Sequence, residues 1–149
     1  MSSDTRYMAL ALSLGRRGLG RTWPNPAVGC VIVADGRVIG RGFTQPGGRP
    51  HAETEALAQA GAHARGADVY VSLEPCAHEG RTGSCAKALI EAQVGRVFVA
   101  ATDPDPRVNG SGMAMLEQAG IKVVQGICEN QARRDNAGFF ARVELDRPF

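Results

Sequence analysis

Three side chains that could bind a metal ion lie in the middle of the chain: His51, Cys76 and Cys85. One imidazole and two thiolates form a ligand set suited to Zn²⁺. Three protein ligands leave the fourth tetrahedral position to water, which is the pattern of a catalytic zinc site and not of a structural one. We therefore predict that these residues bind one catalytic zinc ion.

A carboxylate next to this ligand set could transfer protons. Glu53 follows His51 in the motif His51-Ala52-Glu53. Zinc lowers the pKa of a bound water towards about 7, and a nearby glutamate can take that proton and pass it to a leaving amine. Glu53 is accordingly the predicted catalytic residue. Cys85 is expected in the first turn of a helix, whose N-terminus is predicted to lower the pKa of this thiol.

Each part of this pattern alone has an ordinary explanation. A single histidine often has no role beyond its loop, and two cysteines can form a structural zinc site or a redox pair. The spacing between Cys76 and Cys85 matches no common structural zinc spacing, and a structural site would have no use for Glu53. The combination is typical of zinc deaminases, which carry His-x-Glu before a Pro-Cys motif. A non-catalytic zinc-binding module is a further possible class of function, and the presence of Glu53 argues against it.

The elements that must position these residues alternate between helices and strands. Apolar periodicity and turn residues predict helices over residues 4–19, 52–60, 84–92, 109–119 and 129–143, and strands over 27–34, 37–43, 68–73, 94–101 and 121–125. Asp4 is the expected N-cap of the first helix, and Asp35-Gly36 predicts a tight hairpin turn. A hairpin followed by βαβ units predicts an α/β fold with a mixed sheet covered by helices on both faces. In such sheets, sites form where strands end and helices begin.

The composition is that of a globular protein. The 149 residues are 44% hydrophobic and 21% charged, which suits one domain and excludes a disordered tail protein. A net charge of +2 argues against an extended nucleic-acid surface. The longest apolar run, 27–34, is too short for a bilayer, and the N-terminal segment lacks the layout of a signal peptide. We expect a cytoplasmic protein with reduced thiols and no nucleic-acid or membrane partner, in which Cys30 and Cys128 are small buried core residues.

Longer motifs carry a resemblance to a known family. They cover residues 24–33 (PNPAVGCVIV), 50–53 (PHAE), 73–82 (LEPCAHEGRT), 103–110 (DPDPRVNG) and 119–121 (AGI). Along nearly its whole length the chain resembles the deaminase domain of the bifunctional riboflavin-biosynthesis enzymes, the diaminohydroxyphosphoribosylaminopyrimidine deaminases. The eight residues 77–84, which separate Cys76 from Cys85, are similar to this family. Most nucleoside and tRNA deaminases have only two residues between the cysteines.

The resemblance implies a fold, an activity and a set of site residues. The fold is a cytidine-deaminase-like three-layer α/β/α sandwich with a five-stranded sheet. The activity is zinc-dependent hydrolytic deamination of 2,5-diamino-6-ribosylamino-4(3H)-pyrimidinone 5′-phosphate. The protein could also form a homo-oligomer. The residues implied are His51, Cys76 and Cys85 for zinc, Glu53 for proton transfer, Asn25 and His78 for the pyrimidine, Arg81 for an anionic part of the substrate, and Asp103 and Asn109 at the border of the site.

The chain departs from the family pattern at three places. Thr44 stands where the family often has a substrate-contacting histidine, and Gln45 or Arg49 could replace that contact. Gly83-Ser84 stands where two prolines are usual. The family usually continues into an NADPH-dependent reductase domain; we expect residues 1–149 to form the zinc-dependent deaminase domain, without reductase and without NADP. A deaminase of another nucleobase, nucleoside or tRNA is the alternative activity.

Overall fold

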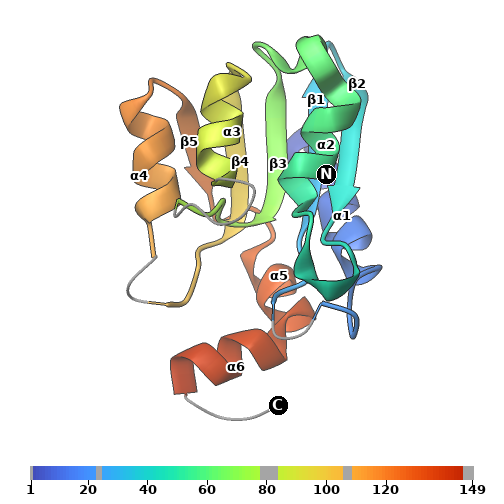
Figure 1. The fold of residues 1–149 in the computed structure, drawn as a ribbon, viewed down its shortest axis with the longest axis vertical. Coiled ribbons are helices and arrows are strands. Elements are labelled where there is room, and N and C mark those ends of the chain that lie inside the picture. The colour runs from blue at the N-terminus through green and yellow to red at the C-terminus, as the bar shows by residue number, and fades with distance from the viewer. Residues whose placement is uncertain (1, 23–24, 78–83, 106–108, 146–149) are drawn as a thin grey trace.

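A five-stranded mixed sheet forms the middle layer of the structure, in the order β2-β1-β3-β4-β5 (Figure 1). The computed structural model describes residues 2–22, 25–77, 84–105 and 109–145. The strands are β1 (Gly29–Ala34), β2 (Arg37–Phe43), β3 (Asp68–Leu73), β4 (Arg96–Ala101) and β5 (Lys122–Gln125). The helices are α1 (Ser3–Arg16), α2 (Ala52–Ala60), α3 (Cys85–Glu91), α4 (Ser111–Gln118), α5 (Glu129–Asp135) and α6 (Ala137–Leu145), with short 3₁₀ turns η1 (Pro46–Gly48) and η2 (Gly61–Ala64).

The strand pairing confirms the predicted α/β architecture. β1 is antiparallel to both β2 and β3, whereas β3, β4 and β5 are parallel. The turn between β1 and β2 has positive φ at both central residues, 51° at Asp35 and 73° at Gly36, as tight hairpins require. Because β3 and β4 are parallel and Leu73 is paired with Ala101, the segments that follow these strands leave the sheet at the same edge. That edge is where the predicted site residues gather.

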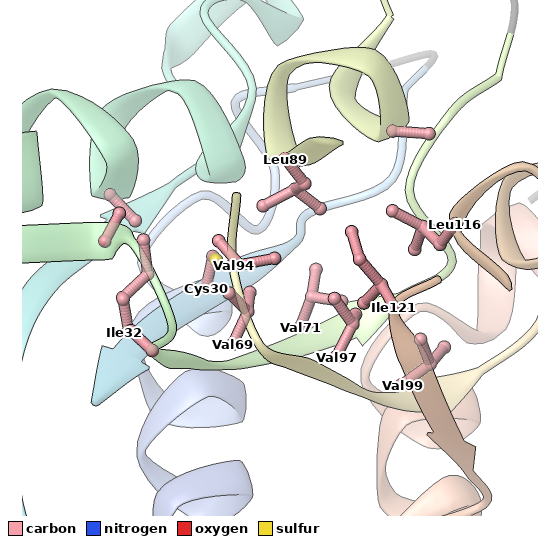
Figure 2. Close-up of a cluster of buried hydrophobic side chains, with 14 of the residues drawn as sticks. Cys30, Ile32, Val69, Val71, Leu89, Val94, Val97, Val99, Leu116 and Ile121 are labelled. Carbon is pink, nitrogen blue, oxygen red and sulfur yellow. The ribbon is translucent and has the colours of Figure 1, made fainter. Parts of the chain in front are cut away.

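Apolar side chains are buried on both faces of the sheet. On one face, Cys30, Val71 and Val99 pack with Leu89 of α3 and Leu116 of α4 (Figure 2). The opposite face packs against α1 and α5. Strands that are covered on both faces have continuous apolar sequences. This explains why the apolar run 27–34 was enough to predict β1.

On the α1 and α5 face, Tyr70 and Phe98 stack with their ring centroids 4.5 Å apart. Met8 of α1 and Ala132 of α5 belong to the same buried cluster. This face therefore has its own core, and the helices form two outer layers. The burial of Cys30 confirms its predicted place in the core, whereas Cys128 is only partly buried, at the start of α5.

The helix bounds differ from the prediction at both ends of the chain. Ser2, not Asp4, caps α1, since its side chain accepts a hydrogen bond from the Thr5 N–H, and α1 ends at Arg16. The predicted helix 129–143 is two helices, α5 and α6, broken at Asn136. Within the described ranges, none of the helices has the length and apolar character needed to cross a bilayer.

Helix α2, which carries Glu53, lies unusually close to β2. A Cβ atom added at Gly42 would lie 2.3 Å from the carbonyl oxygen of Ala52, and one added at Gly40 would lie 2.3 Å from that of Ala56. Only glycine leaves room for this approach. The two glycines thus set the distance between the sheet and the helix that begins directly after His51.

We predict that Gly42→Ala destabilises the fold, because the added methyl group would press on helix backbone that cannot rotate away. The free energy of unfolding, measured by urea denaturation, should fall by about 1–3 kcal/mol. Arg41→Ala is the control: Arg41 is exposed on the other side of the same strand, and its loss should cost no more than about 0.5 kcal/mol. Equal effects of the two substitutions would contradict the close-packing argument.

Candidate metal and substrate site

The three predicted metal ligands come together at the edge of the sheet where β3 and β4 end. Their ligand atoms all lie within 4.8 Å of one another. Nδ1 of His51 is 3.3 Å from Sγ of Cys85 and 3.9 Å from Sγ of Cys76. In a tetrahedral zinc site, with bonds of about 2.0–2.3 Å, ligand atoms lie roughly 3.5–3.8 Å apart. The distances and the donor chemistry therefore fit one zinc ion.

Hydrogen bonds from backbone N–H groups hold the Cys76 segment against the first residues of α3. The Cys85 N–H donates to Sγ of Cys76 at 3.2 Å, and the Ala86 N–H donates to the Cys76 carbonyl at 3.0 Å. Ser84 caps α3 by accepting from the Lys87 N–H at 3.0 Å. His51 occupies the N-cap position of α2 in an extended conformation without capping that helix through its side chain. Its imidazole is consequently available to face the thiols.

The thiol with the lowered pKa is Cys76, not Cys85. The hydrogen bond from the Cys85 thiol, with help from His51 and the Cys85 N–H, lowers the pKa of Cys76 to about 4. Donating that hydrogen bond, together with burial, raises the pKa of Cys85. The prediction for Cys85 was wrong because it considered only the helix N-terminus, and the direct contact between the two sulfurs outweighs that effect.

Glu53 is a buried carboxyl group beside the ligand cluster. Its residue is 4% exposed, in the first turn of α2. Burial, reinforced by the charge of Cys76, raises the pKa of Glu53 to about 7. An acid with this pKa can both accept and release a proton near neutral pH. The environment therefore suits the proton-transfer role predicted for Glu53.

A cavity of about 550 Å³ opens over this cluster. His51, Glu53 and Cys76 line it together with the predicted substrate residues Asn25, Thr44 and Asp103. The other described lining residues are Pro26, Val28, Gly48, Arg49, Leu73, Glu74, Asp105, Phe139, Arg142 and Val143. The predicted substrate contacts His78 and Arg81 lie outside the described residues. So does Gly83, at the place where this chain differs from the family pattern of two prolines. The cavity is of the size that small-molecule sites have.

Two predicted substrate residues on the N-terminal side of the cavity differ in their availability. The hydroxyl of Thr44 accepts from the Val28 N–H at 2.9 Å and lies 3.4 Å from the Val28 carbonyl. This backbone contact indicates that Thr44 braces β1 against the end of β2. Asn25 is exposed in the cavity, and its loop is held by a 2.9 Å hydrogen bond from the Thr22 hydroxyl to the Asn25 carbonyl.

On the other side, Asn109 supports Asp103. Its amide donates to the Asp103 carbonyl at 2.9 Å, and Asn109 is not among the described residues that line the cavity. The Asp103 carboxylate itself accepts from the Asp105 N–H at 3.0 Å. The structure thus brings Asp103 to the cavity and places Asn109 behind it.

Sequence reasoning gave no separate role to Glu74, which organises this edge of the sheet. Its buried carboxylate accepts from four backbone N–H groups: Asp103 at 3.1 Å, Gly110 and Gly112 at 3.0 Å each, and Met113 at 3.4 Å. A Cβ at Gly112 would lie 1.8 Å from the Pro75 carbonyl oxygen, so α4 starts in direct contact with this segment. A glutamate directly after an apolar strand and before a proline was the available signal.

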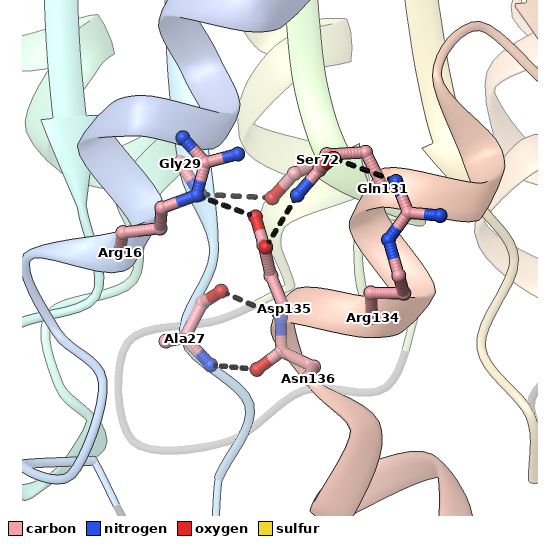
Figure 3. Close-up of polar contacts among 8 residues, drawn as sticks. All are labelled: Arg16, Ala27, Gly29, Ser72, Gln131, Arg134, Asp135 and Asn136. Atoms are coloured by element: carbon pink, nitrogen blue, oxygen red, sulfur yellow. Dashed lines mark hydrogen bonds and ion pairs between the residues drawn. The ribbon is translucent and has the colours of Figure 1, made fainter.

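Helix α6 was also missed as a wall of the cavity. Phe139, Arg142 and Val143 line it, although they lie far along the chain from the ligand motifs. The Asn136 side chain fixes this wall, since it accepts from the Ala27 N–H at 2.8 Å and donates to the Ala27 carbonyl at 2.9 Å (Figure 3). No local motif announces a contact between residues so distant in sequence.

We predict that Glu74→Gln destabilises the protein, because an amide nitrogen would face N–H donors that now have a charged acceptor. The free energy of unfolding should fall by about 1–3 kcal/mol, measured by urea denaturation. Glu117→Gln makes the same change at an exposed position of α4 and should stay within about 0.5 kcal/mol of the parent. A Glu74→Gln protein as stable as this control would refute the organising role.

Comparison with known proteins agrees with this geometry. Residues 1–101 match the family described as the cytidine and deoxycytidylate deaminase zinc-binding region. Riboflavin biosynthesis protein RibD of Aquifex aeolicus is 48% identical over 98% of this chain and 41% of its own length. The solved structure of Acinetobacter baumannii RibD superposes with a TM-score of 0.95 at 52% identity, over 98% of this chain and 41% of that one.

A third relative is the Thermotoga maritima diaminohydroxyphosphoribosylaminopyrimidine deaminase/5-amino-6-(5-phosphoribosylamino)uracil reductase. Its structure has a TM-score of 0.92 at 39% identity, over 98% of this chain and 42% of that one. The chain thus spans about two-fifths of the length of these relatives. By its matched region, the chain belongs to the cytidine and deoxycytidylate deaminase family.

Proposed function

We propose that this chain deaminates 2,5-diamino-6-ribosylamino-4(3H)-pyrimidinone 5′-phosphate by zinc-dependent hydrolysis, giving 5-amino-6-ribosylaminouracil 5′-phosphate and ammonia. The observation that carries the proposal is the His51, Cys76 and Cys85 cluster beside buried Glu53, at a cavity of about 550 Å³. The substrate is supported by the likeness to the RibD proteins over nearly the whole chain.

In this proposal His51, Cys76 and Cys85 hold one zinc ion, which supplies Lewis-acid activation of water when bound. Glu53 receives one proton from the attacking water and delivers it to the ring nitrogen next to the reacting carbon. It then takes the remaining proton of the new hydroxyl group and delivers it to the departing amine, which leaves as ammonia. A carbon–oxygen bond forms and a carbon–nitrogen bond breaks, so water enters and ammonia leaves. A pKa of about 7 equips Glu53 for each of these transfers.

The cavity also supports a small polar substrate. Asn25 offers an amide that can donate to and accept from a pyrimidine, and Asp103 can accept from sugar hydroxyls. His78 and Arg81 are proposed as further contacts, to the pyrimidine and to an anionic group, from the resemblance alone. The alternative, a deaminase acting on another nucleobase, nucleoside or tRNA, shares the zinc chemistry and differs in this substrate pocket.

The deciding experiment is turnover of the proposed substrate by the purified, zinc-loaded chain, followed by ammonia release. We expect product and ammonia in equal amounts. Conversion of only cytosine, guanine or adenosine would overturn the assignment of the substrate, while the assignment of zinc-dependent deamination would stand. Bound zinc without deamination of any of these compounds would favour a non-catalytic zinc module.

We predict that Glu53→Gln separates metal binding from catalysis. The variant should keep one zinc per chain, measured by atomic absorption, while kcat falls by about 10²–10⁴-fold because the proton carrier is lost. Cys76→Ser and Cys85→Ser should instead lose zinc and activity together. Cys128→Ser is a thiol control at the start of α5, among residues that pack on the other face of the sheet, and should keep zinc. A normal rate in Glu53→Gln would mean that another group moves the proton.

A further inference from the structure

Helix α6 places one arginine at the substrate cavity. Arg142 lines the cavity and its Nε is buried, whereas Glu144 and Leu145 on the same helix are exposed. Its guanidinium carbon lies 5.9 Å from the ring centroid of Phe139, and Phe139 also lines the cavity. An arginine packed in this way is already partly ordered, so it loses less freedom when it binds an anion.

The helix that carries Arg142 is fixed to the body of the protein. The paired hydrogen bonds between Asn136 and Ala27 hold its start beside the Asn25 loop (Figure 3). Just before them, Asp135 of α5 forms an ion pair with Arg16 at 3.0 Å. Arg142 therefore lines the cavity from a helix whose start is anchored to the body of the protein.

The other charged groups of the cavity direct an anion towards an arginine. Asp103 and Asp105 line it with carboxylates, which accept hydrogen bonds from hydroxyl groups but repel the negative charge of a phosphate. The Glu74 carboxylate is occupied by backbone N–H groups. The described cations that line the cavity are Arg49 and Arg142. Arg49 is exposed and lies two positions before His51 in the chain, which places it near the reacting end.

We propose that Arg142 binds the phosphate group of the substrate, alongside the contact that the resemblance implies for Arg81, an inference that rests on the proposed function for the identity of that substrate. The reacting pyrimidine must lie at Glu53, and the phosphate is at the far end of the ribosyl group. A guanidinium can form two parallel, charged hydrogen bonds to phosphate oxygens. Arg142 thereby distinguishes a nucleotide-like substrate from its nucleoside.

The kinetic test compares the phosphorylated substrate with its dephosphorylated nucleoside. In Arg142→Gln the preference for the phosphorylated compound, as a ratio of kcat/KM values, should fall about 10- to 100-fold, mainly through KM. Arg142→Lys should recover part of the loss, because it keeps the charge without the planar fork. Arg65→Gln, an exposed position beside the opposite ends of β3 and β4, is the matched control and should keep the parent ratio.

A binding measurement separates this inference from the proposed function. Ribose 5-phosphate should bind the zinc-loaded parent protein by calorimetric titration more tightly than ribose, and Arg142→Gln should abolish the difference. That result would support Arg142 as an anion site even if the deaminase assay fails. An unchanged difference in Arg142→Gln, its loss in Arg49→Gln or Arg81→Gln instead, or loss of zinc from Arg142→Gln would overturn the proposal.

Discussion

One buried carboxylate holds the candidate site together. Glu74 accepts hydrogen bonds from backbone N–H groups in the segment after β4 and at the start of α4. Its own N–H donates to the Ala101 carbonyl at 2.9 Å. Without such an acceptor the buried N–H groups of Gly112 and Met113 would lack a partner, at a cost of about 1–3 kcal/mol each. Because Cys76 lies two positions further along, the fixation of Glu74 also fixes the start of the metal cluster.

The chemistry of the cluster follows from where water is excluded. Glu53 is buried in the first turn of α2, and its raised pKa is the direct result of that burial. Gly42 permits α2 to approach β2 closely enough to bury it. The same carboxyl on a more distant helix would be solvated, and its pKa would return towards that of an ordinary glutamate. The glycine in the strand and the carboxyl on the helix thus act as one device.

The sequence could predict those parts of the site that depend on neighbouring residues. His51, Cys76 and Cys85 each stand at the junction of elements with clear periodicity, so their convergence followed from the fold class. The break at Asn136 depends on Ala27, 109 positions away along the chain, and helix periodicity continues through it. The pKa of Cys85 was misjudged for a related reason, since the effect of the helix end is local and the Cys76 sulfur is a neighbour only in space. Glu74 could have been suspected, but its four partners could not.

Two parts of the cavity lining are built on different principles. The metal site uses short motifs on elements of one sheet edge, where a change of one residue alters the chemistry directly. Another part of the lining is a wall made by α6, positioned through Asn136 and the ion pair of Asp135 with Arg16. Side chains on such a wall can change without moving the metal ligands, because no metal-ligand motif passes through it. In the proposed function the reaction therefore depends on the metal-ligand motifs, whereas the α6 wall contacts what is attached to the reacting ring.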